Sequence, residues 1–131
     1  MRRLAAVVAL VTALAVGCGG DDAPEGADGE GPPPDATLLE GDSVEIRAID
    51  NSFQPEAARV AAGTEVTFNN AGRNDHNVVA EDEGAEWAVD TADFGPGDSS
   101  SYTFEEPGTY RFFCSIHGTI NAGMPGVLVV E

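Results

Sequence analysis

Short stretches of alternating apolar and polar residues, each ended by a turn, constrain the fold of this chain more than any other feature. Ser43 to Ile49 alternates three apolar side chains with polar ones, and Glu65 to Asn69 repeats the pattern with Val66 and Phe68. A period of two residues is typical of strands with one buried face. Four shorter apolar runs indicate further strands, at His76 to Ala80, Ser101 to Phe104, Tyr110 to Cys114 and Gly126 to Val130.

Turn signals separate these runs, and no stretch has a helical period. The turns are expected at Ala62-Gly63, Asn70-Ala71-Gly72, Gly95-Pro96-Gly97 and Pro107-Gly108. Several short strands divided by glycine and proline turns, without repeats, predict an all-β fold of two packed sheets, a β-sandwich. Residues 81–93 show no clear pattern and are interpreted as loop with at most one piece of strand. Trp87 in this loop is expected to be a packing residue or a loop anchor.

The first 17 residues have the layout of a secretory leader, with Arg2 and Arg3 before an apolar stretch that ends at Gly17. This stretch is too short for a stable membrane-spanning helix. Leu14 to Cys18 resembles a bacterial lipobox, in which the leader is cut before the cysteine and Cys18 becomes lipid-modified. Ala15 stands where leucine is usual, so a plain secreted protein cleaved nearby remains an alternative. The chain is therefore expected to be exported, either periplasmic or anchored to the outer face of the cytoplasmic membrane.

Residues 18–41 are rich in glycine, proline and acid and contain few large apolar side chains. Such a segment buries too little surface to offset the entropy of ordering it, so a flexible tether is predicted before a single domain at 42–131. All 6 basic residues are arginines, against 23 acids in the whole chain. So acidic a protein is a poor partner for nucleic acid and for anionic lipid surfaces.

The domain contains a small set of soft metal ligands: His76, Cys114, His117 and Met124. Taken singly, each of these residues is more simply explained as structural, because a lone buried cysteine is usually inert and a lone methionine usually packs in a core. Together, two histidines, one cysteine and one methionine favour copper held for electron transfer. Cys114 ends a predicted strand, His117 follows two residues later, and Met124 precedes the last strand. One loop thus carries three candidate ligands, while His76 comes from another strand.

These residues and their surroundings resemble the plastocyanin branch of the cupredoxins, and the resemblance covers most of residues 43–131. It rests on ordered motifs: His76-Asn77, Gly-Thr-Tyr at 108–110, Cys-x-x-His at 114–117 and Gly-Met at 123–124, with Val66 to Gly72, Phe53-Gln54-Pro55 and Gly63-Thr64. The resemblance implies a Greek-key β-sandwich of the cupredoxin type. It also implies one copper ion, bound by His76, Cys114 and His117 in a trigonal plane with Met124 as a long axial ligand.

Two further residues acquire roles from the same resemblance. The backbone N–H of Asn77 is expected to donate toward the Cys114 sulfur, and its side chain to tie to Ser115, which would hold the ligands in place. The family docks its redox partners around the second histidine, which implies a docking face at Ile116, Ile120 and Pro125. The implied function is a monomeric blue-copper electron carrier that is not an enzyme, with a redox protein such as a cytochrome or a terminal oxidase as partner.

The chain also departs from the family pattern. Residues 118–123 form a segment about two residues longer than usual between the second histidine and the methionine, which makes Met124 the ligand to check. Phe113 stands where plant members have a surface tyrosine. Glu81-Asp82-Glu83 resembles their acidic patch for a cationic cytochrome, although a solvated loop explains it equally well.

Three other functions remain to be separated from electron transfer. A copper-storage or copper-delivery protein could share the fold, but would be expected to have more methionine and histidine. An adhesion sandwich would need no ligand set. An oxidase or nitrite-reducing enzyme would need further histidines for a second copper.

Overall fold

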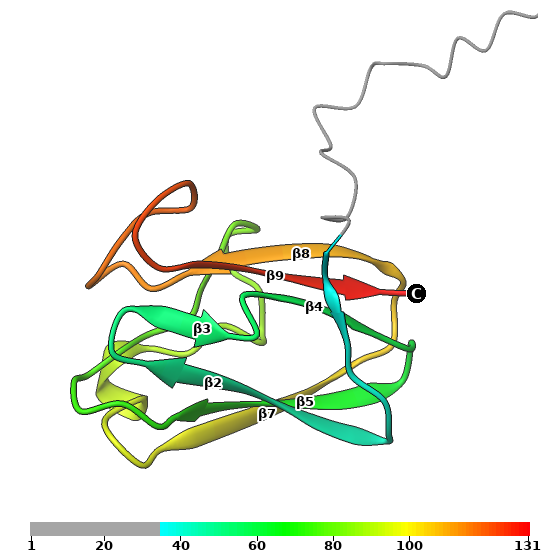
Figure 1. Cartoon of the computed structure of the whole chain (residues 1–131), viewed down its shortest axis with the longest axis horizontal. Coiled ribbons are helices and arrows are strands. Elements are labelled where there is room, and N and C mark those ends of the chain that lie inside the picture. Colours follow the sequence, from blue (N-terminus) through cyan, green and yellow to red (C-terminus); the bar gives the residue numbers. More distant parts are fainter. Residues whose placement is uncertain (1–34) are drawn as a thin grey trace, which may run out of the picture.

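The computed structural model describes residues 35–131, and these residues form two stacked β-sheets (Figure 1). The elements, in chain order, are β1 (Thr37–Leu38), β2 (Ser43–Ile49), β3 (Ser52–Gln54), β4 (Ala57–Val60), β5 (Thr64–Asn70), β6 (Val79–Ala80), the 3-10 turn η1 (Thr91–Asp93), β7 (Ser99–Phe104), β8 (Gly108–Phe113) and β9 (Pro125–Val130). One sheet has the order β1-β4-β9-β8-β6 and the other β3-β2-β5-β7. The all-β sandwich predicted from the sequence is thus confirmed.

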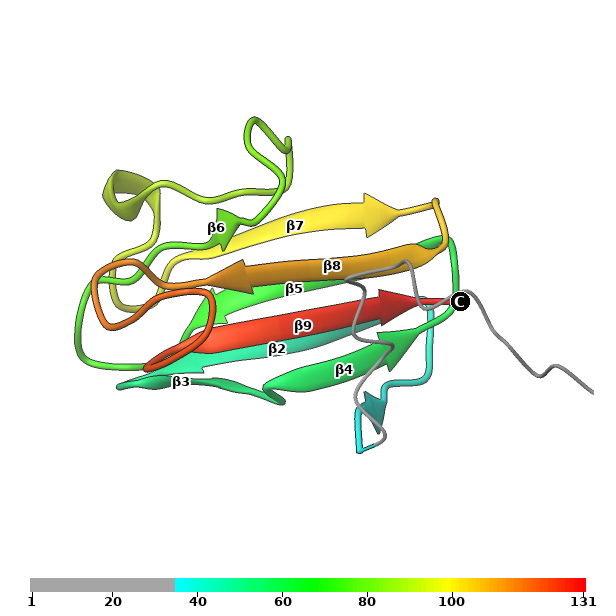
Figure 2. The ribbon, with the colours of Figure 1, turned by 90° about the horizontal axis from the view of Figure 1, so that it is seen from above.

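Both sheets are mixed, because the chain repeatedly crosses from one sheet to the other. β2 runs parallel to β5 and β4 runs parallel to β9, whereas β8 and β9 are antiparallel neighbours. The β5–β6 connection and the β8–β9 loop lie at the same end of the sandwich, away from the C-terminus, in two perpendicular views (Figures 1 and 2). This arrangement brings the segment before β6 close to the loop after β8.

Aromatic side chains fill the space between the sheets. Phe112 from β8 makes edge-to-face contacts with Phe53 and Phe68, with ring centroids 4.9 and 5.3 Å apart. Such pairs contribute about 0.5–1.5 kcal/mol each beyond the area they bury. Gly126 pairs with Phe112 across β8 and β9, and a Cβ atom at this glycine would collide with the Phe112 ring. Glycine is therefore required at 126 for the ring to lie over the strand.

Trp87 closes this core from the loop between β6 and η1. Its side chain is buried and stacks on Phe68 with ring centroids 6.3 Å apart, and it also contacts Phe104 and Tyr110. The packing role expected for Trp87 is confirmed. The loop at 81–93, which has no pattern of its own, is thus held by one aromatic side chain that inserts between the sheets.

The strands with clear alternation match the prediction closely, and the short ones do not. β2 has the predicted bounds, and β5, β7 and β9 extend the predicted strands by one or two residues at their ends. The run from His76 to Ala80 contains only the two-residue β6, because Val78 pairs with Val89 of the loop instead of with a strand. β3 and β4 had not been predicted.

Regular structure begins before the predicted domain boundary at Asp42. β1 falls within the segment interpreted as a tether and pairs in parallel with β4, and the Leu39 N–H donates to the Arg59 carbonyl at 2.9 Å. Ala36 is also buried. The predicted leader, Cys18 and residues 18–34 of the predicted tether lie outside the described residues. Among the residues that are described, no helix is long and apolar enough to cross a membrane.

Candidate metal centre

Three of the four predicted ligands converge at the end of the sandwich where the β5–β6 connection meets the β8–β9 loop. One donor atom each from His76, Cys114 and His117 lies within 4.8 Å of the others. The Nδ1 atoms of the two histidines are both 3.6 Å from the Cys114 Sγ. His76 and Cys114 are fully buried, whereas His117 is half-buried at the surface.

These separations fit a small metal ion bound between the three atoms. A first-row ion lies about 2.1 Å from an imidazole nitrogen and about 2.3 Å from a thiolate, so a trigonal angle would separate N and S by about 3.8 Å. The observed 3.6 Å is close to this value. Two imidazoles and one thiolate are the donor set that copper takes in trigonal electron-transfer sites. The residues present therefore fit one copper ion.

Met124 is brought to the same place through the backbone of the β8–β9 loop. The Cys114 N–H donates to the Met124 carbonyl at 3.0 Å, which closes the loop at its base. The Met124 side chain is fully buried and belongs to the same buried cluster as Cys114. This packing is compatible with an axial ligand, and the contact of its sulfur with the metal stays a prediction.

The segment between His117 and Met124, expected to be longer than in plastocyanins, forms a small closed turn. The Thr119 N–H donates to the Ala122 carbonyl at 2.7 Å. At the base of the turn the two glycines touch: a Cβ atom on Gly123 would lie 2.7 Å from the Gly118 Cα and 2.5 Å from the His117 carbonyl oxygen. Gly123 also has a positive φ of 87°, which favours glycine. The close contact between Gly118 and Gly123, here called the glycine neck, closes the turn formed by residues 119–122. His117 precedes this neck in the chain and Met124 follows it.

The surroundings of His76 favour the neutral form of its imidazole. Burial lowers the pKa of its imidazole below the usual 6.5, and the neighbouring His117 lowers this pKa further, whereas Asp50 and Asp75 act in the opposite direction. A neutral ring keeps a lone pair on one nitrogen, and a metal requires that lone pair. The Nε2 atom is buried and has no hydrogen-bond partner among residues 35–131. The Nδ1 atom, which faces Cys114, is the donor that the geometry offers.

Asn77 joins the two segments that supply the ligands. Its Oδ1 accepts the Ser115 N–H at 2.8 Å, and its Nδ2 donates to the Ser115 hydroxyl at 2.8 Å and to the Thr91 hydroxyl at 3.2 Å. The side-chain tie between Asn77 and Ser115 is thus present. The expected donation from the Asn77 backbone to the Cys114 sulfur stays a prediction.

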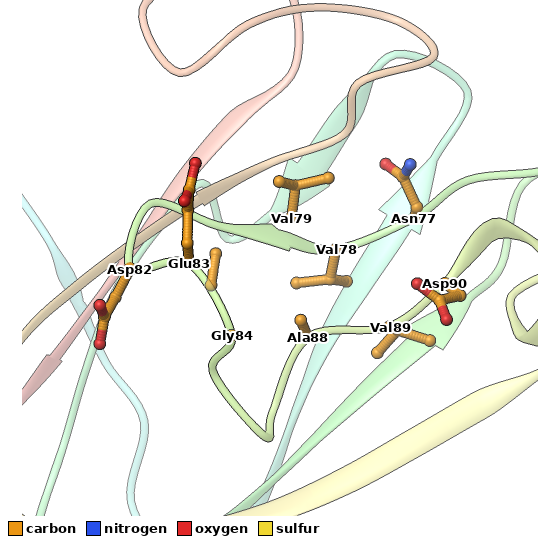
Figure 3. A pocket seen from close by; sticks show the side chains of 10 residues that line it. Asn77, Val78, Val79, Asp82, Glu83, Gly84, Ala88, Val89 and Asp90 are labelled. Atoms are coloured by element: carbon orange, nitrogen blue, oxygen red, sulfur yellow. The ribbon is translucent and has the colours of Figure 1, made fainter.

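A shallow pocket lies next to Asn77, between β6 and the loop that follows it (Figure 3). Its volume of about 240 Å³ is below the range of about 300–1,000 Å³ typical of sites for organic ligands. Val78, Val79 and Val89 line it together with Asp82, Glu83 and Asp90. Glu81 points instead toward Arg111, with which it forms an exposed ion pair at 3.4 Å. Docking at this acidic loop therefore stays a prediction.

The residues expected at the docking face all reach the surface, as does the half-buried His117. Ile116 is 47% exposed, one of the largest apolar exposures in the described chain, and Ile120 and Pro125 are partly exposed. Asn70, by contrast, was read from the sequence only as a turn residue, and the structure buries it beside the His76 segment. The sequence does indicate that Asn70 is buried, because it continues the alternation that places Val66 and Phe68 on the inward face of β5.

Comparison with known proteins agrees with this geometry. The sequence matches the family model described as copper binding proteins, plastocyanin/azurin family, over residues 42–131. Chloroplastic plastocyanin of Physcomitrium patens is 42% identical over 86 residues, which cover 60% of this chain and 50% of that protein. Plastocyanin of Sambucus nigra is 35% identical over 89 residues, which cover 61% of this chain and 88% of that protein. The chain thus spans about half the length of the first of these relatives and most of the second.

Solved structures show the same similarity in three dimensions. Oxidised plastocyanin from Dryopteris crassirhizoma superposes with a TM-score of 0.55 and 28% identity, over 67% of this chain and 100% of that one. A copper-containing nitrite reductase from Thermus scotoductus has a TM-score of 0.56 and 30% identity, over 71% of this chain but only 23% of the reductase. The similarity to the reductase is therefore confined to a small part of that enzyme.

Proposed function

Because the chain belongs to the plastocyanin/azurin family of copper-binding proteins, we propose that it is a blue-copper electron carrier that cycles one ion between Cu(II) and Cu(I). The observation that carries this proposal is the convergence of two imidazole nitrogens and one thiol sulfur within 4.8 Å. The three side chains come from segments 38 residues apart in sequence, since His76 precedes β6 and Cys114 follows β8. Copper as the single cofactor agrees with both the family and the donor set.

Each ligand has a defined part in this function. His76 and His117 would bind copper through Nδ1 and Cys114 would bind it as a thiolate, with Met124 as the weaker axial donor. The bound copper supplies the redox change itself. The protein holds His76, Cys114 and Met124 in a buried, packed environment that excludes water and limits rearrangement when the charge changes. Four protein ligands leave no open position for a substrate, which favours electron transfer over catalysis.

We place the path of the electron at His117, the only one of the two histidines that reaches the surface. Ile116, Ile120 and Pro125 would form an apolar docking face around its ring. A redox protein such as a cytochrome or a terminal oxidase fits this face, whereas nucleic acid does not fit a chain with a net charge of −17. We also propose that the protein acts as a monomer outside the cytoplasm, held at the membrane or in the periplasm by lipid on Cys18.

The other functions have less support. A copper-storage or copper-delivery protein would need additional soft ligands, but the whole sequence contains 2 histidines and 2 methionines, one of which is the initiator. A copper enzyme with a second metal would need further histidines as well, and both histidines already lie in the one cluster. The relatives named as plastocyanins favour an electron carrier over either alternative.

Titration with copper tests the proposal directly. The purified protein should bind one Cu(II) per chain and turn intensely blue, because charge transfer from a thiolate to Cu(II) absorbs visible light. Ascorbate should bleach the colour and ferricyanide should restore it. Cys114→Ser should remain colourless with Cu(II), and the wild-type protein with Zn(II) provides the colourless control. A colourless copper complex, or blue colour that survives in Cys114→Ser, would show that the proposal is wrong.

A further inference from the structure

A buried asparagine at the end of β5 lies between the sheet and the segment that carries His76. Asn70 is fully buried and pairs with Ala48 of β2. Its backbone is also fixed on the other side, since its N–H donates to the Asp98 carbonyl and its carbonyl accepts the Gly97 N–H, both at 2.9 Å. The backbone of Asn70 is therefore bonded within the four-stranded sheet, at the point where β5 ends and the connection to β6 begins.

The side-chain amide of Asn70 forms two hydrogen bonds with that segment and a third with Phe94, which follows η1. Its Nδ2 donates to the Asn74 carbonyl at 2.9 Å and to the Phe94 carbonyl at 2.8 Å, and its Oδ1 accepts the Gly72 N–H at 3.0 Å. Both amide hydrogens are thus used, which is the full donor capacity of an asparagine side chain. A buried amide bonded in this way holds the backbone at 72 and 74 at a fixed distance from the sheet.

The Phe94 carbonyl connects this amide to His76 itself. The same oxygen accepts the His76 N–H at 3.2 Å, so one carbonyl receives hydrogen bonds from both Asn70 and His76. The Phe94 side chain is fully buried, which fixes the position of its carbonyl. The backbone of His76 is therefore located relative to β5 through one shared acceptor.

Close packing at Gly72 limits the imidazole ring from the other side. A Cβ atom on Gly72 would lie 3.2 Å from the His76 Nε2 and 2.8 Å from the Asp50 backbone nitrogen. The backbone that Asn70 holds at Gly72 thus forms a wall against the His76 ring. A displacement of Gly72 or Asn74 would change where the Nδ1 atom points.

From these contacts we propose that Asn70 is a positioning residue for the metal site, which sets the location of His76 through Gly72, Asn74 and the Phe94 carbonyl. This proposal rests on the function proposed above, in which His76 binds copper. Asn70 in β5 would thus position the His76 segment, as Asn77 positions the Cys114 segment through its hydrogen bonds to Ser115. Partners that orient metal ligands typically contribute 10–100-fold to metal affinity.

The variant Asn70→Ser tests the proposal, because serine keeps a polar side chain but cannot reach both carbonyls. Asn69→Ser is the matched control, since Asn69 is the preceding residue of β5 and its side chain makes only an exposed 3.4 Å hydrogen bond to Glu45. We expect copper affinity, measured by competition with a chelator, to fall by about 10–100-fold in Asn70→Ser and to stay unchanged in Asn69→Ser.

Amide hydrogen exchange of the copper-free protein provides a second measurement that does not depend on copper. A positioning role predicts faster exchange at His76 in Asn70→Ser, with unchanged exchange at Leu128 in β9. Equal acceleration at both amides would indicate a general loss of stability and would overturn the proposal. If Asn70→Ser does not fold, the pair Asn70→Asp and Asn69→Asp decides by the same two measurements. Failure of both Asn70 variants to fold would make Asn70 a folding residue and overturn the proposal.

The two proposals can fail separately. A wild-type protein that binds no copper would refute the proposed function, while exchange at His76 would still report on Asn70. A wild-type protein that turns blue, together with an Asn70→Ser variant of unchanged copper affinity, would refute only the positioning role.

Discussion

The side-chain amide of Asn77 forms two hydrogen bonds of 2.8 Å with Ser115, one accepted from the Ser115 backbone and one donated to its hydroxyl. Asn77 follows His76, and Ser115 follows Cys114, so the pair links the two segments that supply the metal donors. A neutral hydrogen bond contributes about 1 kcal/mol net to stability. The larger effect is geometric, because the distance between the His76 and Cys114 backbones is fixed before any metal binds.

Replacing this link should weaken copper binding more than it weakens the fold. We expect Asn77→Ala to reduce copper affinity by about 10–100-fold, since the loop at Ser115 is released. Equilibrium competition with a copper chelator measures this. Thr91→Ala is the control, because it removes the third partner of Asn77, at 3.2 Å, and leaves both bonds to Ser115 intact. Equal losses in the two variants would contradict the importance of the Ser115 contact.

Met124→Leu should retain the blue colour and raise the reduction potential. Leucine has a similar volume and fits the fully buried site, so the fold should remain. Loss of an axial donor that stabilises Cu(II) more than Cu(I) favours reduction. Voltammetry of the two proteins gives the comparison. An unchanged potential would assign the axial position to another group.

Shortening the closed turn at 118–123 should leave the metal site intact. Deleting Ile120 and Asn121 would remove the two residues by which the segment is expected to exceed the family pattern, and the glycine neck should still hold His117 and Met124. We expect an unchanged visible spectrum and an altered rate of electron exchange with a protein partner, since Ile120 lies on the proposed docking face. Gly118→Ala provides the contrast, because its Cβ atom would collide with the Met124 backbone nitrogen and distort the site. A deletion variant without blue colour would contradict this prediction.

Tyr110 should make the domain sensitive to alkaline pH. Burial raises the pKa of its phenol above the usual 10.0, and the nearby Glu106 raises it further. The folded state therefore keeps its proton where the unfolded state loses it, so the free energy of unfolding should fall as pH rises above 10.0. Below that pH the contribution is fully present. Urea unfolding over this range measures the effect, and Tyr110→Phe should have a weaker dependence on pH. An identical dependence in both proteins would exclude Tyr110 as the cause.

Much of the fold could be predicted because one face of the longer strands is buried. β2 and β5 alternate clearly, and their bounds are close to those predicted. β3 and β4 could not be recognised, since each has at most four residues and β4 begins with two alanines, which have little preference for strands. β6 was overestimated because the apolar run before it serves the metal site and the pair Val78 and Val89 instead of a ladder.

The parts of the candidate site that consist of side chains could be predicted from the sequence. The parts that consist of backbone atoms could not. The side chains of His76, Cys114 and His117 meet as the sequence indicated. The Phe94 carbonyl, which accepts the His76 N–H, leaves no trace in the sequence because every residue has a carbonyl. The glycine neck at Gly118 and Gly123 likewise depends on two backbones that touch only in the folded protein.

The pairing of β1 with β4 also affects how the domain should be isolated. β1 is the outermost strand of its sheet, so a protein that starts at Asp42 would leave the backbone of β4 bare along that edge. Exposed strand edges pair with other chains and promote aggregation. A start before Ala36, which is itself buried, keeps this edge capped and should keep the isolated domain monodisperse at high concentration.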